Sequence, residues 1–154
     1  MNRFQFFLKA KTQYNLHSPF VFHLYREVLF APLDKVRRKE LGIERSDLYG
    51  ELLYKLTNHL RPDTLFLPSE DPKAATIVQK ASPKTITTTL AALPSSSSRA
   101  SLSIFPHPHT SHDTEEQWHR ICQTDKSTAS IDLYYAGIVL FDPKLSKQHF
   151  LLRK

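Results

Sequence analysis

The chain has 154 residues, of which 40% are hydrophobic and 23% charged, and 21 Lys and Arg against 15 Asp and Glu give a net charge of +6. This length and composition are typical of a folded domain and exclude a disordered or membrane-spanning class of protein. Only 3 residues are glycine, whereas average usage gives roughly ten in a chain of this length. Since Gly42, Gly50 and Gly137 are far apart, no GxGxxG, P-loop or GxSxG signature can be written.

Two helices are predicted in the first 61 residues. Ser18 and Pro19 are typical of an N-cap and a first helical position, and the apolar residues that follow share one helical face: Val21, Leu24, Tyr25, Val28 and Leu29. A second helix is predicted to begin at Ser46 or Asp47 and to end before Arg61-Pro62. We therefore divide the chain into an N-terminal helical extension, residues 1–45, and an α/β domain, residues 46–154, within a single compact unit.

Strand and helix signals alternate after Pro62. Helix starts are predicted at Asp71-Pro72 and at Asp113, where Glu116 completes a capping box. Strands are predicted at Thr64–Leu67, Thr85–Thr89, Leu102–Phe105, Ser130–Phe141 and His149–Arg153. This spacing predicts an α/β fold with a mostly parallel sheet, in which the last two strands form a C-terminal antiparallel hairpin.

The N-terminal part of the chain carries most of the excess positive charge. Residues 1–61 contain eleven Lys and Arg against six Asp and Glu. The densest run holds the cations Lys35, Arg37, Arg38 and Lys39, which are candidates for contacts with nucleic acid. The alternative is a basic surface that faces only solvent, because acids are interspersed and no nucleic-acid-binding motif accompanies the run.

Three histidines and an aspartate lie close together in the segment Pro106–Asp113. Imidazole and carboxylate groups are ligands for Zn²⁺ and other divalent metals, so His107, His109 and His112 are weak metal candidates. Prolines stiffen this segment, no HExxH spacing is present, and Asp113 is explained by helix capping. We therefore expect no metal site.

Other reactive residues have structural explanations. Ser18 with His17 or His23 could form a nucleophile and base, but helix capping accounts for Ser18. The lone Cys122 excludes an intramolecular disulfide and is expected to be a buried, inert thiol. Asp132 interrupts an apolar strand, and its charge is expected to face solvent or to be neutralised by one of three cations: Lys144, Lys147 or Arg153.

Three stretches of the chain are informative in combination: Tyr14–Phe22, with its HSPFVF; Leu52–Thr64; and Glu115–Arg153, with EEQWHRI, SIDLYYAGIVLF and KQHFLLR. Together they resemble the HSPF-type class I SAM-dependent methyltransferases of Bacteroidetes, in which the second stretch is similar to the helix before the family's first Rossmann strand. The resemblance covers about half of the chain. It implies a truncated Rossmann-like methyltransferase sheet preceded by two N-terminal helices.

The family's cofactor-binding positions are changed. Phe66 replaces the acid after the first strand, and Pro68 and Pro72 replace two glycines of the turn that approaches S-adenosylmethionine. Proline fixes φ and lacks the N–H donor. Thr87–Leu90 occupies the end of the second strand, where the family has an acid, and Pro106-His107 stands for its paired aspartates. The Ser-rich loop over residues 90–99 replaces a βαβ portion of the sheet. The resemblance assigns the degenerate SAM turn to Leu67, Pro68, Ser69, Glu70 and Asp71.

These changes predict a degenerate SAM-dependent methyltransferase-like protein that does not catalyse methyl transfer and has a binding or partner-stabilising role, as a homodimer or with an active paralogue. No cofactor is expected, except S-adenosylmethionine if the ancestral site is retained. One alternative is an active small-molecule methyltransferase with a site rebuilt around Ser69, Glu70 and the segment His107–Asp113. The other is a basic nucleic-acid-associated module. No apolar run is long enough for a signal peptide or membrane span, so a cytoplasmic protein without membrane contact is expected.

Overall fold

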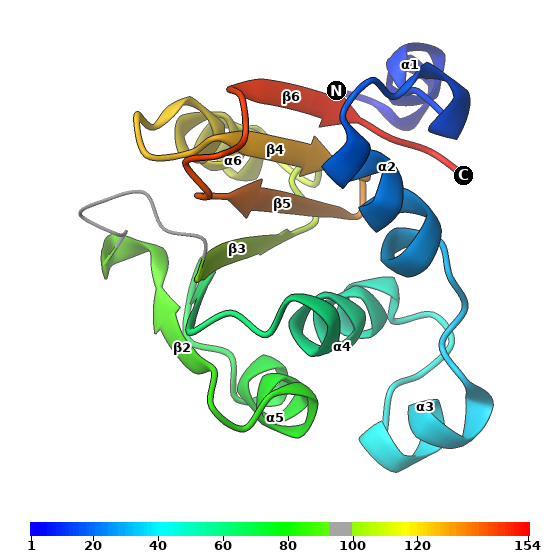
Figure 1. Cartoon of the computed structure of the whole chain (residues 1–154), viewed down its shortest axis with the longest axis vertical. Coiled ribbons are helices and arrows are strands. Elements are labelled where there is room, and N and C mark those ends of the chain that lie inside the picture. The colour runs from blue at the N-terminus through cyan, green and yellow to red at the C-terminus, as the bar shows by residue number, and fades with distance from the viewer. Residues whose placement is uncertain (93–99) are drawn as a thin grey trace.

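The computed structural model describes residues 1–92 and 100–154. The predicted Ser-rich loop lies mostly outside the described residues, after the short 3-10 turn η3 (Leu90–Ala92). In the described part, helices α1 to α6 and a six-stranded mixed sheet form an α/β fold. Figure 1 shows α4 and α5 together on one side of the sheet and α6 on the other.

The N-terminal part contains more helix than the sequence predicted. Its elements are α1 (Arg3–Lys9), η1 (Gln13–Asn15), α2 (Pro19–Leu24), the π-helical turn η2 (Tyr25–Leu29), α3 (Lys35–Leu41) and α4 (Leu48–Leu60). The two predicted helices are confirmed as α2 with η2 and as α4, and the Ser18 and Asp47 side chains cap them. The prediction of only two helices was wrong, because α1 and α3 are too short to show a clear apolar period.

The remaining elements also begin close to their predicted positions, except β5, which the sequence predicted as the second half of one strand. They are β1 (Thr64–Leu67), α5 (Pro72–Ala81), β2 (Ile86–Thr89), β3 (Ser101–Pro106), α6 (His112–Gln123), β4 (Ala129–Asp132), β5 (Ala136–Leu140) and β6 (Gln148–Leu151). Asp71 caps α5 as predicted. The predicted capping box of α6 was wrong: Ser111 is the N-cap and pairs with Thr114, so Asp113 lies inside the first turn.

The strand order is β2-β1-β3-β5-β4-β6. Strand β1 pairs in parallel with β2 and β3, whereas β5 is antiparallel to both β3 and β4. The predicted hairpin between the last two strand segments was wrong, because Ser130–Phe141 is itself the hairpin of β4 and β5. Strand β6 lies on the far side of β4 and runs parallel to it.

The turn of the β4–β5 hairpin, residues 133–135, contains no glycine, proline or asparagine, so the sequence gives no turn signal there. Tyr134 adopts a left-handed conformation with φ of 72°, which is rare for a residue with a bulky side chain. Its N–H donates to Asp132 Oδ1 over 2.8 Å, and the Leu133 N–H donates to the Ala136 carbonyl over 2.9 Å. A side chain from the end of β4 therefore fixes the turn.

Each sheet face packs against different helices. Alternation along the strands sends Leu65, Ile104 and Ile138 toward α2, α4 and α5, where the main apolar core lies. Phe66, Phe105, Val139 and Phe141 point the other way and pack with Trp118 and Ile121 of α6. The hydrophobic surface buried in these two layers is the principal stabilising term of the fold.

The segment after α1 runs beside β6. The Lys11 N–H donates to the Leu151 carbonyl over 2.7 Å, and the Arg153 N–H donates to the Lys11 carbonyl over 3.0 Å. Consequently α1 and both chain ends lie near the same end of the sheet (Figure 1). None of the helices in the described ranges combines the length and the apolar composition that a bilayer crossing requires.

Candidate functional site

The predicted cofactor positions lie around a cavity of about 420 Å³ at the carboxyl ends of β1 and β2. We call it the threonine pocket, after Thr87, Thr88 and Thr89 in its wall. The opposite wall is the loop from β1 to α5. Of the five predicted positions, four line the cavity, namely Leu67, Ser69, Glu70 and Asp71; Pro68 belongs to the same loop but not to the lining.

The side chain of Asp71 already caps the N-terminus of α5, which borders this pocket. Asp71 Oδ1 accepts from the Ala74 N–H over 3.1 Å, and the Asp71 carbonyl accepts from the Ala75 N–H over 2.9 Å. Pro72 has no N–H to offer. Of the amides that would otherwise receive an anion, the Ala74 N–H is already bonded to Asp71 and position 72 has no N–H, and Glu70 adds a second carboxylate. This surface disfavours a phosphate or a carboxylate.

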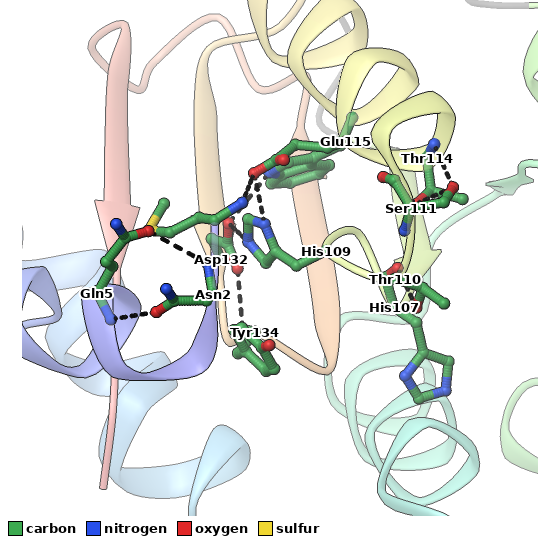
Figure 2. Close-up of polar contacts among 12 residues, drawn as sticks. Asn2, Gln5, His107, His109, Thr110, Ser111, Thr114, Glu115, Asp132 and Tyr134 are labelled. Atoms are coloured by element: carbon green, nitrogen blue, oxygen red, sulfur yellow. Dashed lines mark hydrogen bonds and ion pairs between the residues drawn. The ribbon is translucent and has the colours of Figure 1, made fainter.

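A buried ionic cluster lies near the other end of the sheet. His109 donates from Nε2 to Asp132 Oδ2 over 2.7 Å and from Nδ1 to Glu115 Oε1 over 2.9 Å. The His109 and Asp132 side chains are 1% and 2% exposed. Figure 2 shows the imidazole between the two carboxylates, at the start of α6 and the end of β4. We call His109, Asp132 and Glu115 the His109 cluster.

Other groups complete the contacts of this cluster. The indole Nε1–H of Trp118 donates to Asp132 Oδ2 over 3.2 Å, and the Met1 ammonium forms an ion pair with Glu115. His109, the Trp118 indole and the Tyr134 N–H together satisfy Asp132 although it is buried, as a buried charge requires. The prediction that Lys144, Lys147 or Arg153 neutralises Asp132 was wrong. Lys147 instead donates to the Thr124 and Ser127 carbonyls.

The protonation state of His109 follows from its two partners. Burial by itself lowers the pKa of an imidazole, but the hydrogen bonds and charges of Asp132 and Glu115 raise the pKa of His109 above its ordinary value. The Met1 ammonium and His109 hold the pKa of Glu115 below its usual range. With both ring nitrogens donating, the imidazolium has no lone pair for a proton. His109 therefore holds structure together and is not positioned as a general base.

A second cavity, of about 450 Å³, lies beside the His109 cluster. Aromatic side chains form much of its wall, and we call it the aromatic pocket: Phe6, Phe7, Phe30, Tyr134 and Tyr135. The Tyr134 ring stacks on His109 at 5.2 Å between centroids, and the buried Phe6 ring meets Tyr134 edge-on at 5.4 Å. The cluster therefore holds the wall of this cavity rigidly in place.

The three candidate metal histidines do not converge. His107 has a φ of 45° and lies 6.4 Å from the Tyr49 ring, between centroids, and it points away from His109 (Figure 2). His112 is the first residue of α6. In the ranges 1–92 and 100–154, no group of three or more His, Cys, Asp or Glu is arranged to hold a metal ion.

The candidate nucleic-acid residues lie on α3. Arg37 pairs with Glu40 over 3.0 Å, and Arg38 pairs with Glu51. Lys35 and Lys39 are exposed on the same short helix. Because carboxylates of the chain already contact the two arginines, the positive field of this run is weaker than its composition implies.

Two polar residues near Asp132, Ser130 and His149, were not predicted to lie together. Ser130 and His149 hydrogen-bond over 2.7 Å between Oγ and Nδ1, next to the Asp132 side of the sheet. Period-two alternation already places Ser130 and Asp132 on one face of β4, but nothing in the sequence places His109 beside them. Cys122 is half-buried, and burial raises its pKa to about 12, so its thiol stays protonated. Ser18 only caps α2.

Comparisons of the chain with protein-family models, with curated proteins and with solved structures found no match. Any functional conclusion therefore depends on the site geometry described above.

Proposed function

We propose that this protein is a methyltransferase-like binding protein that does not catalyse methyl transfer. Support comes from the resemblance of its two ends to SAM-dependent methyltransferases and from the α/β fold with parallel β1, β2 and β3. The observation that carries the proposal is the start of α5, to which the resemblance assigns the cofactor turn.

The start of α5 is poorly suited to S-adenosylmethionine. The cofactor's amino-acid end carries a carboxylate, which needs free N–H donors or cations. Here Pro72 has no donor, Asp71 accepts from Ala74, and Glu70 is a further negative charge at the same cavity. Anion binding by a helix N-terminus requires the opposite arrangement. We therefore infer that the intact cofactor binds weakly or not at all.

The rival site around Ser69, Glu70 and the segment His107–Asp113 is divided between two cavities. Ser69 and Glu70 line the threonine pocket, whereas His107 and His109 line the aromatic pocket. The two nitrogens of His109 are already bonded to carboxylates. A catalytic acid or base must come within hydrogen-bond reach of the reacting group, so this separation favours a binding role.

Titration calorimetry with S-adenosylmethionine and S-adenosylhomocysteine tests the proposal. We expect no micromolar binding to the wild-type chain. A double variant, Pro68→Gly with Pro72→Gly, restores backbone freedom and two N–H donors, and adding Asp71→Ala releases the Ala74 N–H. Binding that appears only in the triple variant would support the blocked-turn explanation. Micromolar binding by the wild-type chain would contradict the proposal.

The partner-stabilising part of the proposal concerns β2. Within residues 1–92 and 100–154, β2 pairs only with β1 and forms one edge of the sheet, and its Ile86 side chain is 67% exposed. An uncharged strand edge can pair with another chain. We expect a dimer by light scattering at tens of micromolar and a monomer for Ile86→Lys. A monomeric wild-type mass would count against self-association.

A further inference from the structure

We propose that the aromatic pocket binds a small aromatic carboxylate. This site lies apart from the threonine pocket, and its occupant is independent of S-adenosylmethionine. Six parts of the chain meet around it: α1, Phe30 after η2, the start of α4 at Leu48, the segment between β3 and α6, the turn between β4 and β5, and the segment after β6. Its volume of about 450 Å³ lies in the range of about 300–1,000 Å³ that holds small ligands.

The walls of the pocket suit a flat apolar ring. Phe6 is 1% exposed, and its ring contacts both Tyr134 and His109, at 5.4 and 5.9 Å between centroids. Asp132 fixes the Tyr134 backbone, and His109 stacks beneath the Tyr134 ring. Aromatic faces and edges held in this way offer stacking and edge-to-face contacts to an aromatic guest.

The rim of the pocket is positively charged. The Arg3 guanidinium lies 5.7 Å from the Phe7 ring centroid, and that of Arg153 lies 6.0 Å from the same centroid. Lys154 also lines the cavity, and among its described lining residues none is Asp or Glu. Neither guanidinium forms an ion pair with a carboxylate of the described ranges. Within the described residues, the two arginines beside the Phe7 ring have no Asp or Glu side chain as a partner, and a single anionic group on a ligand would match them.

A carboxylate on an aromatic ring combines both requirements. Arginine binds carboxylates through paired N–H···O contacts, while the ring fills the apolar body of the cavity. The negative members of the His109 cluster do not cancel this attraction, because Asp132 and Glu115 are bonded to the imidazolium and Glu115 also pairs with the Met1 ammonium.

The test uses 2-naphthoate and its uncharged analogue 2-naphthamide, measured by titration calorimetry at low salt. We expect the wild-type chain to bind naphthoate at least tenfold more tightly than naphthamide. The double variant Arg3→Gln with Arg153→Gln should lose about tenfold in naphthoate affinity and keep its naphthamide affinity. Phe7→Leu, at a 39% exposed residue, should weaken both.

The matched control is Arg120→Gln, which removes an exposed arginine of α6 paired with Glu116. We expect its naphthoate affinity to equal that of the wild type. Equal affinity of the wild type for the two probes, no binding of either, or an equal loss in Arg120→Gln would each overturn the proposal. Far-UV circular dichroism and the naphthamide titration confirm that the variants fold. Binding of S-adenosylmethionine would contradict only the proposed function, and insensitivity to Arg3 and Arg153 would contradict only this site.

Discussion

The two cavities of this protein differ in what holds their walls. The aromatic pocket is supported by the buried His109 cluster, whose groups come from α6, β4 and the segment between β3 and α6. The threonine pocket is bordered by a loop and an edge strand whose side chains are mostly exposed or half-buried. The first cavity is therefore part of the folding core, whereas the second can change without loss of the fold.

Asp132 provides the strongest test of this difference. Asp132→Ala removes the acceptor of the His109, Trp118 and Tyr134 donors and leaves a buried imidazolium with one partner fewer. Removing one member of a buried pair costs about 3–5 kcal/mol. We expect a loss of this size in urea unfolding. The control Asp125→Ala changes an exposed carboxylate and should be nearly neutral. Equal losses in both variants would contradict the supporting role of the cluster.

Gly137 tests the packing beneath the same cluster. A Cβ at Gly137 would lie 2.4 Å from Cζ3 of the fully buried Trp118 ring. Since Trp118 also donates to Asp132, its indole cannot move freely, and overpacking of this kind costs about 1–3 kcal/mol. We expect Gly137→Ala to lower the midpoint of thermal unfolding. Gly42→Ala, at φ +66 with open space around it, should cost about 1–2 kcal/mol, because a side chain strains this left-handed backbone. A neutral Gly137→Ala would show that the indole is mobile.

The aromatic pocket should also respond to pH. The pKa of His109 is raised in the folded state, so its contribution to stability is complete below the ordinary value of 6.5 and is lost as pH rises through the folded pKa. The folded pKa of His149 is lowered by burial, so its contribution no longer changes above pH 6.5. We expect the free energy of unfolding of the wild type to fall as pH rises from 6.5 through the folded pKa of His109. A fall of the same size in His109→Gln would exclude His109 as its cause.

Substitution at the threonine pocket should have the smallest effect. Glu70 is exposed, and surface substitutions of this kind change stability by about 0.5 kcal/mol or less. We expect Glu70→Gln to unfold at the wild-type denaturant midpoint. The substitution leaves Asp71 as the one acidic side chain among the described lining residues of the pocket. Destabilisation approaching that of Asp132→Ala would remove the distinction between the cavities.

Local chemistry made part of this structure predictable. The caps Ser18, Asp47 and Asp71 each accept from an N–H three residues ahead, a contact that depends only on neighbouring residues. The residues Leu67–Asp71 were grouped by the family resemblance, and they stay together in the structure because they follow one strand directly. The His109 cluster was not, since its members are separated by up to 23 residues and the sequence pattern suggested metal ligands or helix caps instead.

The sequence by itself determined the positions of most helices and strands, which faces are apolar, and which signatures the scarcity of glycine excludes. The tertiary structure was needed to reveal the turn inside Ser130–Phe141, the parallel position of β6 and the partner of Asp132. The physical reason is the sequence separation over which each kind of interaction acts. Capping and alternation act within a few residues, whereas a buried charge takes its partner from whichever strand or helix the completed sheet brings beside it. Glycine scarcity excluded common phosphate-binding turns, and the position of α1 created an unforeseen pocket.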